Sequence, residues 1–101
     1  MSYGVRVSPR AEAQIEAAAS WWSENRPKAP GAFRKEIERG FELARAFPSA
    51  GESVEHPRYK DARRILLGRI RYYLYYSVSR ETETVKILAL WHTSRGSAPN
   101  L

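Results

Sequence analysis

The sequence of 101 residues contains no cysteine and only two histidines, His56 and His92. Disulfide bonds and thiolate metal sites are therefore excluded, and two histidines alone do not make a convincing zinc site. No apolar run approaches the roughly 20 residues that a membrane-spanning helix requires. The opening MSYGVRVSPR also lacks the apolar segment of a secretory signal. We therefore expect a cytoplasmic protein with no metal, no cofactor and no membrane contact.

Acidic residues are scarcer than basic ones: 11 aspartates and glutamates stand against 17 lysines and arginines, and the net charge is +6. Almost all of this excess lies in residues 58–71, where six basic side chains minus the single Asp61 give +5. The six are Arg58, Lys60, Arg63, Arg64, Arg69 and Arg71. Such a concentration favours an anionic partner, either nucleic acid or an acidic protein segment. A sheet edge that its arginines keep solvated is the alternative interpretation.

The first half of the chain predicts a short strand and two helices. Residues 3–7 alternate weakly, and Ser8 and Pro9 then supply an N-cap and a first-turn proline for a helix over residues 11–25. A second helix is predicted over residues 32–47, and the short connection favours an antiparallel hairpin. The expected apolar faces are Ile15, Ala18, Ala19 and Trp22 on the first helix, and Phe33, Ile37, Phe41 and Ala44 on the second.

The second half of the chain predicts strands. Residues 47–62 hold two prolines and a glycine, and we expect a loop there with room for one extra turn. Three strands with short links, which favour an antiparallel meander, are predicted over residues 64–67, 71–78 and 84–91. The tail from about residue 93 has no periodicity. We therefore expect one α+β domain over residues 1–101 in the order β-α-α-β-β-β, with an antiparallel helical hairpin packed on a small, mainly antiparallel sheet.

The middle strand of this meander is unusually rich in tyrosine and arginine, with the sequence RIRYYLYYSV over residues 69–78. Side chains of a strand alternate between its two faces, so the apolar alternation divides this segment into two sets. Tyr72, Leu74, Tyr76 and Val78 share one face, which we expect to lie under the helical hairpin. Arg71, Tyr73, Tyr75 and Ser77 share the other face.

The chemistry available for catalysis is limited. No nucleophile-elbow pattern, phosphate-binding loop or metal-ligand spacing is found. A metal-free nuclease needs a general base, a general acid and cations for the developing phosphorane charge. The residues that can fill those roles are Arg71, Tyr73, Tyr75, His92 and Arg95. The alternative for His92 is a histidine that caps or packs at the end of the last strand.

Trp21 and Trp22 are adjacent on the first predicted helix and therefore point about 100° apart. Trp22 continues the apolar face and is expected in the core. Trp21 is expected to be half exposed, where a tryptophan is a good anchor for a partner protein. Packing of Trp21 against the second helix is the alternative.

Three motifs, taken in order and spacing, suggest a family. They are the arginine–aliphatic–glycine strand at residues 63–68, the tyrosine-rich strand, and a last strand that closes in W-H-x-x-R at residues 91–95. Together with the two helices SPRAEAQIEAAASWW and FRKEIERGFELARAFP, the pattern resembles the RelE/ParE toxin superfamily of type II toxin–antitoxin modules over essentially the whole chain. The resemblance implies the same β-α-α-β-β-β fold.

The superfamily has two activities. RelE-like members cleave ribosome-bound mRNA with basic residues on the sheet, typically an arginine within the third strand, and in some a tyrosine near the carboxyl terminus. Here Tyr73 occupies that arginine's inferred position, no tyrosine follows Tyr76, and Arg95 matches the second basic position only with a shift of one residue. A RelE-like enzyme would have to use Arg71, Tyr75, His92 and Arg95.

ParE-like members lack the nuclease set, have a long helical hairpin and poison DNA gyrase. The long alanine-rich hairpin and the departures from the RelE pattern favour a ParE-like gyrase inhibitor without catalysis of its own. The alternatives are a RelE-like ribosome-dependent endoribonuclease and an inactive module that only binds antitoxin.

The resemblance also implies partners: a ParD-like antitoxin, DNA gyrase as target, and operator DNA reached only through the antitoxin. Antitoxins of this family wrap the toxin with an amphipathic, often acidic segment, which suits the basic segment. The residues that we expect to bind the antitoxin are Trp21, Arg58, Arg63, Arg64, Arg71 and Tyr73. We predict that substitutions of Arg63, Arg64, Arg71 or Trp21 weaken the complex.

Overall fold

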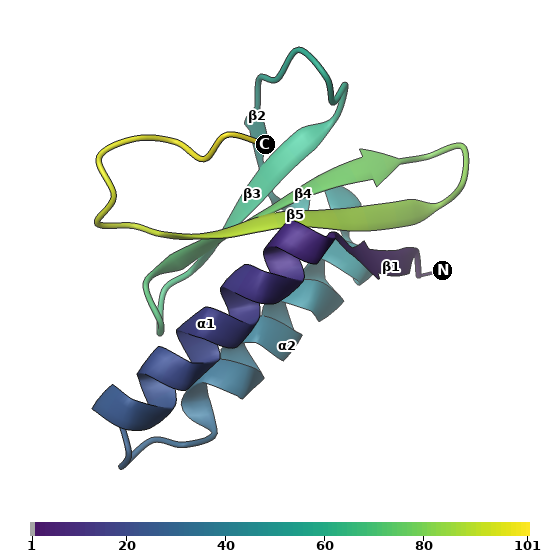
Figure 1. Ribbon diagram of the computed structural model, residues 1–101. Helices are drawn as coiled ribbons and strands as arrows, with labels where there is room; N and C mark the ends of the chain where they lie inside the picture. Colours follow the sequence, from purple (N-terminus) through teal and green to yellow (C-terminus); the bar gives the residue numbers. More distant parts are fainter. Residues whose placement is uncertain (1) are drawn as a thin grey trace.

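The computed structural model describes residues 2–101. The helical hairpin, α1 and α2, covers one face of the sheet, and the other face carries no helix (Figure 1). The elements in chain order are β1 (Gly4–Val7), α1 (Pro9–Asn25), α2 (Ala32–Ala46), the 3-10 turn η1 (Pro48–Ala50), β2 (Glu52–Val54), β3 (Ala62–Leu67), β4 (Tyr72–Ser79) and β5 (Thr84–His92). The predicted α+β fold with its helical hairpin is confirmed.

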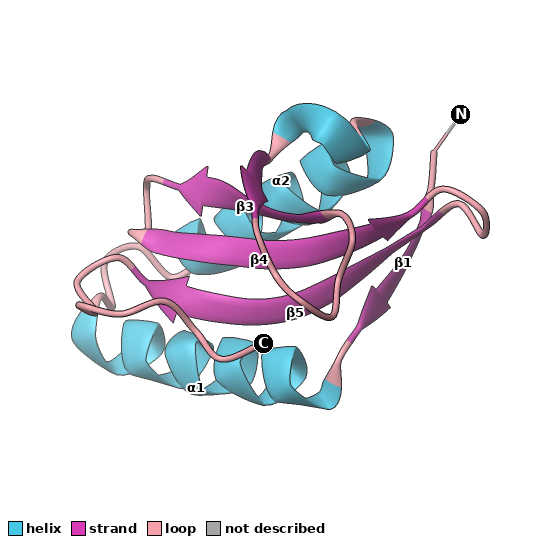
Figure 2. Cartoon of the chain, turned by 90° about the horizontal axis from the view of Figure 1, so that it is seen from above, coloured by secondary structure: helices cyan, strands magenta, loops and turns pink. Residues whose placement is uncertain are grey.

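The sheet has the strand order β1-β5-β4-β3-β2 and is mixed. The three pairs from β5 to β2 are antiparallel, as the meander predicted, whereas β1 pairs in parallel with β5. This pairing brings residues 4–7 beside residues 84–87, so the first strand of the chain forms the sheet edge next to the last strand (Figure 2). A register shift between Tyr75 and Tyr76 marks a bulge in the long β4–β5 pair.

Strand β2 corrects the prediction that residues 47–62 form only loop and turn. It has three residues, Glu52–Val54, and extends the sheet by pairing antiparallel with β3. Glu52 lies opposite Arg64, and the Arg64 Nε donates to Glu52 Oε1 at 2.6 Å. A strand this short has too few residues for a period-2 pattern, and its position depends on an edge strand provided by another part of the chain.

The start of α1 follows the predicted capping chemistry. The Ser8 hydroxyl accepts the Ala11 N–H at 3.1 Å, and Pro9 occupies the first turn. Trp22 is half-buried, and its indole N–H donates to the Ala29 carbonyl at 3.0 Å, which ties the helix to the connection before α2. The predicted apolar face was partly wrong: Ala19 is exposed.

The main core lies between the hairpin and the sheet. Its fully buried side chains on the sheet include Leu67, Leu74, Tyr76 and Ile87, and Phe33 and Ile37 contribute from α2. The face predicted for the β4 side chains is confirmed, because Tyr72 and Val78 pack against the same cluster. The buried Tyr76 hydroxyl accepts the Gly51 N–H at 2.9 Å and donates to the Pro48 carbonyl at 2.8 Å, so its polar atom is satisfied.

One buried charge joins α2 to the sheet. Glu36 is only 3% exposed, although the helical pattern gave no sign of it. Its carboxylate accepts Arg39 Nε at 2.8 Å and the Arg69 backbone N–H at 3.2 Å. The Arg39 hydrogen bond is the main cause that lowers the pKa of Glu36, against the opposing effect of burial. Glu36 therefore anchors the turn between β3 and β4 as an ionised group.

The face of the sheet opposite the helices, the open face, has a smaller core of its own. Tyr75, Leu88 and Ala89 are buried there, with Trp91 and Leu101 packed against them. The carboxyl-terminal tail curves back over this face (Figure 1), where the Trp91 indole N–H donates to the Ser97 carbonyl at 2.7 Å. Residues 93–101 form no helix or strand, yet Leu101 packs against the cluster that contains Tyr75.

Across residues 2–101, no helix combines the length and apolarity that crossing a membrane requires. The same residues contain no cluster of three or more histidine, aspartate or glutamate side chains able to hold a metal ion.

Candidate functional site

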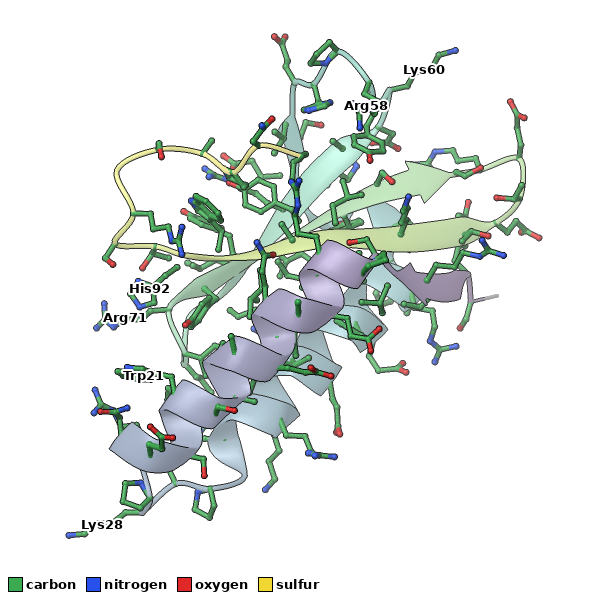
Figure 3. All side chains as sticks on the ribbon, viewed as in Figure 1. Trp21, Lys28, Arg58, Lys60, Arg71 and His92 are labelled. Atoms are coloured by element: carbon green, nitrogen blue, oxygen red, sulfur yellow. The ribbon has the colours of Figure 1, made fainter. Side chains whose placement is uncertain are left out.

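One end of the sheet gathers most of the candidate side chains. The last turn of α1, the β3–β4 turn and the end of β5 meet there, and they bring Trp21, Arg71 and His92 to the same side of the molecule (Figure 3). Two adjoining hollows, of about 240 and 260 Å³, are both lined by Trp21, Tyr72 and His92. We call the surface formed by Trp21, Arg71, Tyr72, His92 and Arg95 the sheet-end surface.

Trp21 is the exposed apolar part of the sheet-end surface. It is 49% exposed, as the helical geometry predicted, and the Arg26 guanidinium lies 5.6 Å from its ring centroid. An aromatic ring that borders hollows and is flanked by a cation can receive an apolar side chain and an acidic group from the same partner.

Arg71 was predicted within the strand, but it lies in the turn before β4. Its φ is 62°, the left-handed region, and its N–H donates to the Leu67 carbonyl at 2.9 Å. The turn forms because Ile70 is pulled into the core, where it is 3% exposed. The Arg71 carbonyl accepts the Thr93 N–H at 2.9 Å, so the turn is held against the chain that leaves β5. The Arg71 side chain is exposed at the edge of the surface.

His92 ends β5, and its ring is fixed by its neighbours. Nδ1 accepts the Ser94 backbone N–H at 3.0 Å and lies 2.7 Å from the Ser94 hydroxyl. Since Nδ1 is the acceptor, the proton of the neutral ring belongs on Nε2. The ring also stands edge-on to Tyr72, with centroids 4.9 Å apart. In this form Nε2 can donate a hydrogen bond but has no lone pair with which to remove a proton.

Tyr72 and Arg95 form the polar border of the surface. Burial raises the pKa of Tyr72, and the positive charge of Arg95 opposes that effect, so Tyr72 stays a neutral phenol near pH 7. The Arg95 guanidinium also lies 4.1 Å from the Trp91 ring centroid. This stacking holds an arginine from the irregular tail close to the sheet.

A third hollow, of about 250 Å³, lies on the open face and is also lined by Arg95 and His92. Arg64 borders it and is fully engaged: it lies 4.1 Å from the Tyr73 centroid, bonds to Glu52, and donates to the Tyr75 hydroxyl at 3.3 Å. The hydrogen bonds from Glu52 and Tyr75 raise the pKa of Arg64 above its usual value. Tyr75 is only 2% exposed, so its hydroxyl is shielded from a large substrate.

The structure brings some predicted residues together and separates others. Seven of them lie at or beside the sheet end: Trp21, Arg64, Arg71, Tyr73, Tyr75, His92 and Arg95. Arg63 faces away from this group, because it donates to Asp61 at 2.8 Å and to the Gly51 carbonyl at 2.9 Å. Arg58 is exposed in the β2–β3 loop, far from Trp21 in Figure 3.

Sequence reasoning assigned Tyr72 to the core and did not see its second role. It packs under the hairpin, yet its edge lines both hollows of the sheet-end surface. Its place at the first position of β4, next to a turn, was the available signal: a strand's terminal side chain often reaches both core and surface.

Comparison with known proteins places the chain in a family. Residues 5–96 match the family described as the ParE toxin of the type II toxin–antitoxin system parDE. Among solved structures, a chain of the chromosomal ParDE system from P. aeruginosa has a TM-score of 0.71 at 20% identity, covering 91% of this chain and 97% of that one. A search of curated protein sequences gives no significant match.

Two other solved structures share the fold. A chain of the RelBE2 toxin–antitoxin complex from Mycobacterium tuberculosis has a TM-score of 0.65 at 20% identity, covering 91% of this chain and 99% of that one. A chain of the archaeal RelE–RelB complex from Pyrococcus horikoshii OT3 has a TM-score of 0.67 at 22% identity, covering 95% and 100%. These structural likenesses extend the fold to both branches of the superfamily. By the match over residues 5–96, the chain belongs to the ParE toxin family of type II toxin–antitoxin systems.

Proposed function

We propose that this protein is a toxin that inhibits DNA gyrase, has no catalytic activity of its own, and is neutralised by a protein antitoxin. The observation that carries the proposal is the ParE family match over residues 5–96, because ParE-like members of the superfamily poison gyrase.

The geometry of the nuclease candidates supports a non-catalytic toxin. A ribonuclease of this type needs a base within hydrogen-bond reach of the ribose hydroxyl and cations free to meet the phosphorane. His92 has its Nδ1 occupied by Ser94, and Tyr75 is only 2% exposed. Arg64, the cation beside the open-face hollow, is stacked on Tyr73 and paired with Glu52.

The sheet-end surface supports recognition of another protein. It combines the half-exposed Trp21, two hollows and the cations Arg71 and Arg95, which together resemble the aromatic and arginine anchors of protein interfaces. The solved structures with the same fold are toxin–antitoxin complexes, which supports an antitoxin as one partner. An acidic, amphipathic antitoxin segment would place an apolar side chain beside Trp21 and carboxylates beside the arginines.

Two assays with the purified full chain test the target. The first adds the protein to gyrase and relaxed plasmid, and measures supercoiling and the amount of cleaved DNA. The second adds it to ribosomes translating a defined mRNA, and maps cleavage by primer extension. We expect gyrase inhibition that the antitoxin reverses, and intact mRNA. Codon-phased mRNA cleavage would identify a RelE-like enzyme, and inactivity in both assays together with normal growth on induction would identify an inactive module.

The antitoxin surface is tested by calorimetry with single variants. Trp21→Ala and Arg71→Ala are expected to weaken antitoxin binding about tenfold or more, as central anchors of an interface do. Arg34→Ala, an exposed arginine on α2, is the matched control and should bind normally. Unchanged affinity in both test variants would remove the sheet-end surface from the antitoxin interface.

A further inference from the structure

A further cavity lies on the open face, at the opposite end of the sheet from Trp21. It has a volume of about 500 Å³. Four cations from three parts of the chain line it: Arg6 of β1, Lys86 of β5, and Arg58 and Lys60 of the β2–β3 loop. The two loop residues lie at the top of Figure 3, on the side of the sheet away from the helices. We call this cavity the basic cavity.

Two of its cations are forced together by the sheet. Arg6 and Lys86 are register partners in the parallel β1–β5 pair, so their side chains leave the same face side by side. Like charges placed next to each other on one face of a sheet destabilise it. Both side chains are exposed, and an anion bound between them would remove the repulsion.

The cavity has no free acid to neutralise these charges. Asp61 is the acidic residue of its lining, but Asp61 is bonded to Arg63 at 2.8 Å and to Arg80 at 3.3 Å. Within residues 2–101, none of the four lining cations forms an ion pair. A concave site with four unpaired cations and a low local acid content concentrates anions.

The remaining polar lining fits phosphate groups. The strand side chains Ser77 and Ser79 present hydroxyl groups, which donate to phosphate oxygens in nucleic-acid complexes. The Ser79 oxygen accepts the Thr82 hydroxyl at 2.9 Å and keeps its own proton free, whereas the Thr84 hydroxyl donates to the Thr82 carbonyl at 3.1 Å. The aromatic residue of the lining, Tyr59, is half-buried against the open-face core, and its ring lies tilted against that of His56, with centroids 5.2 Å apart. A platform for an unstacked base is therefore missing from this lining, which favours a paired duplex over a single strand.

We propose that the basic cavity binds the phosphodiester backbone of duplex DNA. The contact is sequence-independent, so it is separate from operator recognition through an antitoxin. The role of this contact rests on the proposed function: a toxin that binds gyrase through another surface would use the basic cavity to bind the DNA segment that gyrase holds. The two surfaces lie at opposite ends of the sheet, so a protein and a DNA can be bound together.

The direct test is fluorescence anisotropy of the full chain with a labelled 20-base-pair duplex at several salt concentrations. Four phosphate contacts give a slope of log affinity against log salt of about −3 to −4. The double variant R6Q/K86Q should make the slope less negative by about 2 and weaken duplex binding at least about tenfold at 0.1 M salt. R58Q/K60Q, which leaves the sheet untouched, should have a similar effect.

The control is R34Q/K35Q, which removes the same two charges from the exposed face of α2. Circular dichroism verifies that each variant is folded. Equal losses in control and test variants would mean that net charge alone attracts DNA, and the proposal would fail. The proposal would also be overturned if the wild type bound single-stranded DNA as tightly as the duplex. Poly-glutamate stands in for an acidic protein segment: if R6Q/K86Q lost binding to poly-glutamate but kept its binding to the duplex, the cavity would not be a DNA site.

The gyrase assay keeps this proposal separate from the proposed function. If both are right, R6Q/K86Q should raise the concentration needed for gyrase inhibition, whereas R34Q/K35Q should not. If wild-type protein binds duplex DNA through the cavity but leaves gyrase active, the cavity stands and the gyrase target falls. If gyrase is inhibited equally by wild type and R6Q/K86Q, the cavity has no part in that inhibition and its proposed role is refuted.

Discussion

Replacing Glu36 tests how the helical hairpin is attached to the sheet. Its buried carboxylate holds Arg39 and the backbone N–H of Arg69, which begins the turn leading to Arg71. Glu36→Ala removes both bonds and leaves the Arg69 N–H without its partner, a loss of about 3 kcal/mol for hydrogen bonds to a charged group. In a domain of this size, a loss of that magnitude lowers the melting temperature by roughly 12 °C or more.

Glu36→Gln separates the two bonds. The amide oxygen can still accept the Arg69 N–H, whereas the ion pair with Arg39 is lost. Because Arg39 is 51% exposed, solvent screens that pair, and we expect a loss of only about 1 kcal/mol. The free energy of unfolding should therefore fall from wild type to Glu36→Gln and again to Glu36→Ala. The second step measures what the hydrogen bond to the Arg69 N–H contributes.

Acid should abolish the difference between wild type and Glu36→Gln. The pKa of Glu36 is lowered in the folded chain, so the unfolded chain, with a glutamate pKa near 4.3, binds this proton more readily. The stability from the carboxylate is complete above that value and is lost as the pH falls through the folded pKa. The difference in free energy of unfolding between wild type and Glu36→Gln should therefore be constant near neutral pH and should shrink as the pH falls below about 4.

Urea unfolding followed by tryptophan fluorescence measures these values. Glu38→Ala, an exposed glutamate on the same helix, is the control and should shift the free energy of unfolding by less than about 0.5 kcal/mol. If Glu36→Ala were no more destabilising than Glu38→Ala, or if the difference in stability between wild type and Glu36→Gln did not shrink as the pH falls below about 4, the carboxylate would not be the anchor described above.

Three further substitutions probe the fold. Gly40→Ala places a Cβ 2.9 Å from Leu67 Cδ2; overpacking outweighs the helix-propensity gain, and we expect a loss of about 1 kcal/mol in urea unfolding. Tyr76→Phe deprives the Gly51 N–H and the Pro48 carbonyl of a buried partner and should cost about 2 kcal/mol, with an unchanged urea m-value. Arg71→Gly relieves a left-handed φ of 62° and should raise the free energy of unfolding by about 0.5 kcal/mol, with a slightly higher melting temperature. A melting temperature below that of the wild type would contradict the strain at this turn.

Features that depend only on neighbouring residues could be predicted before the fold was known. Ser8 and Pro9 mark the start of α1 because a side-chain cap and a missing N–H act within one turn. The alternation in residues 72–78 assigned the β4 side chains to the correct faces, because period-2 geometry is local. The half exposure of Trp21 also followed from helical geometry.

Contacts between distant segments, by contrast, became visible only in the folded chain. The parallel β1–β5 pair joins residues about 80 positions apart, so no local pattern shows that Arg6 and Lys86 become neighbours. Arg63 and Arg64 are adjacent and therefore lie on opposite faces, but the hairpin decides which face is open. The packing of Leu101 against the Tyr75 cluster and the burial of Glu36 likewise depend on contacts between distant segments. Composition counts the charges of a chain, and only such contacts show which of them are buried, paired or free.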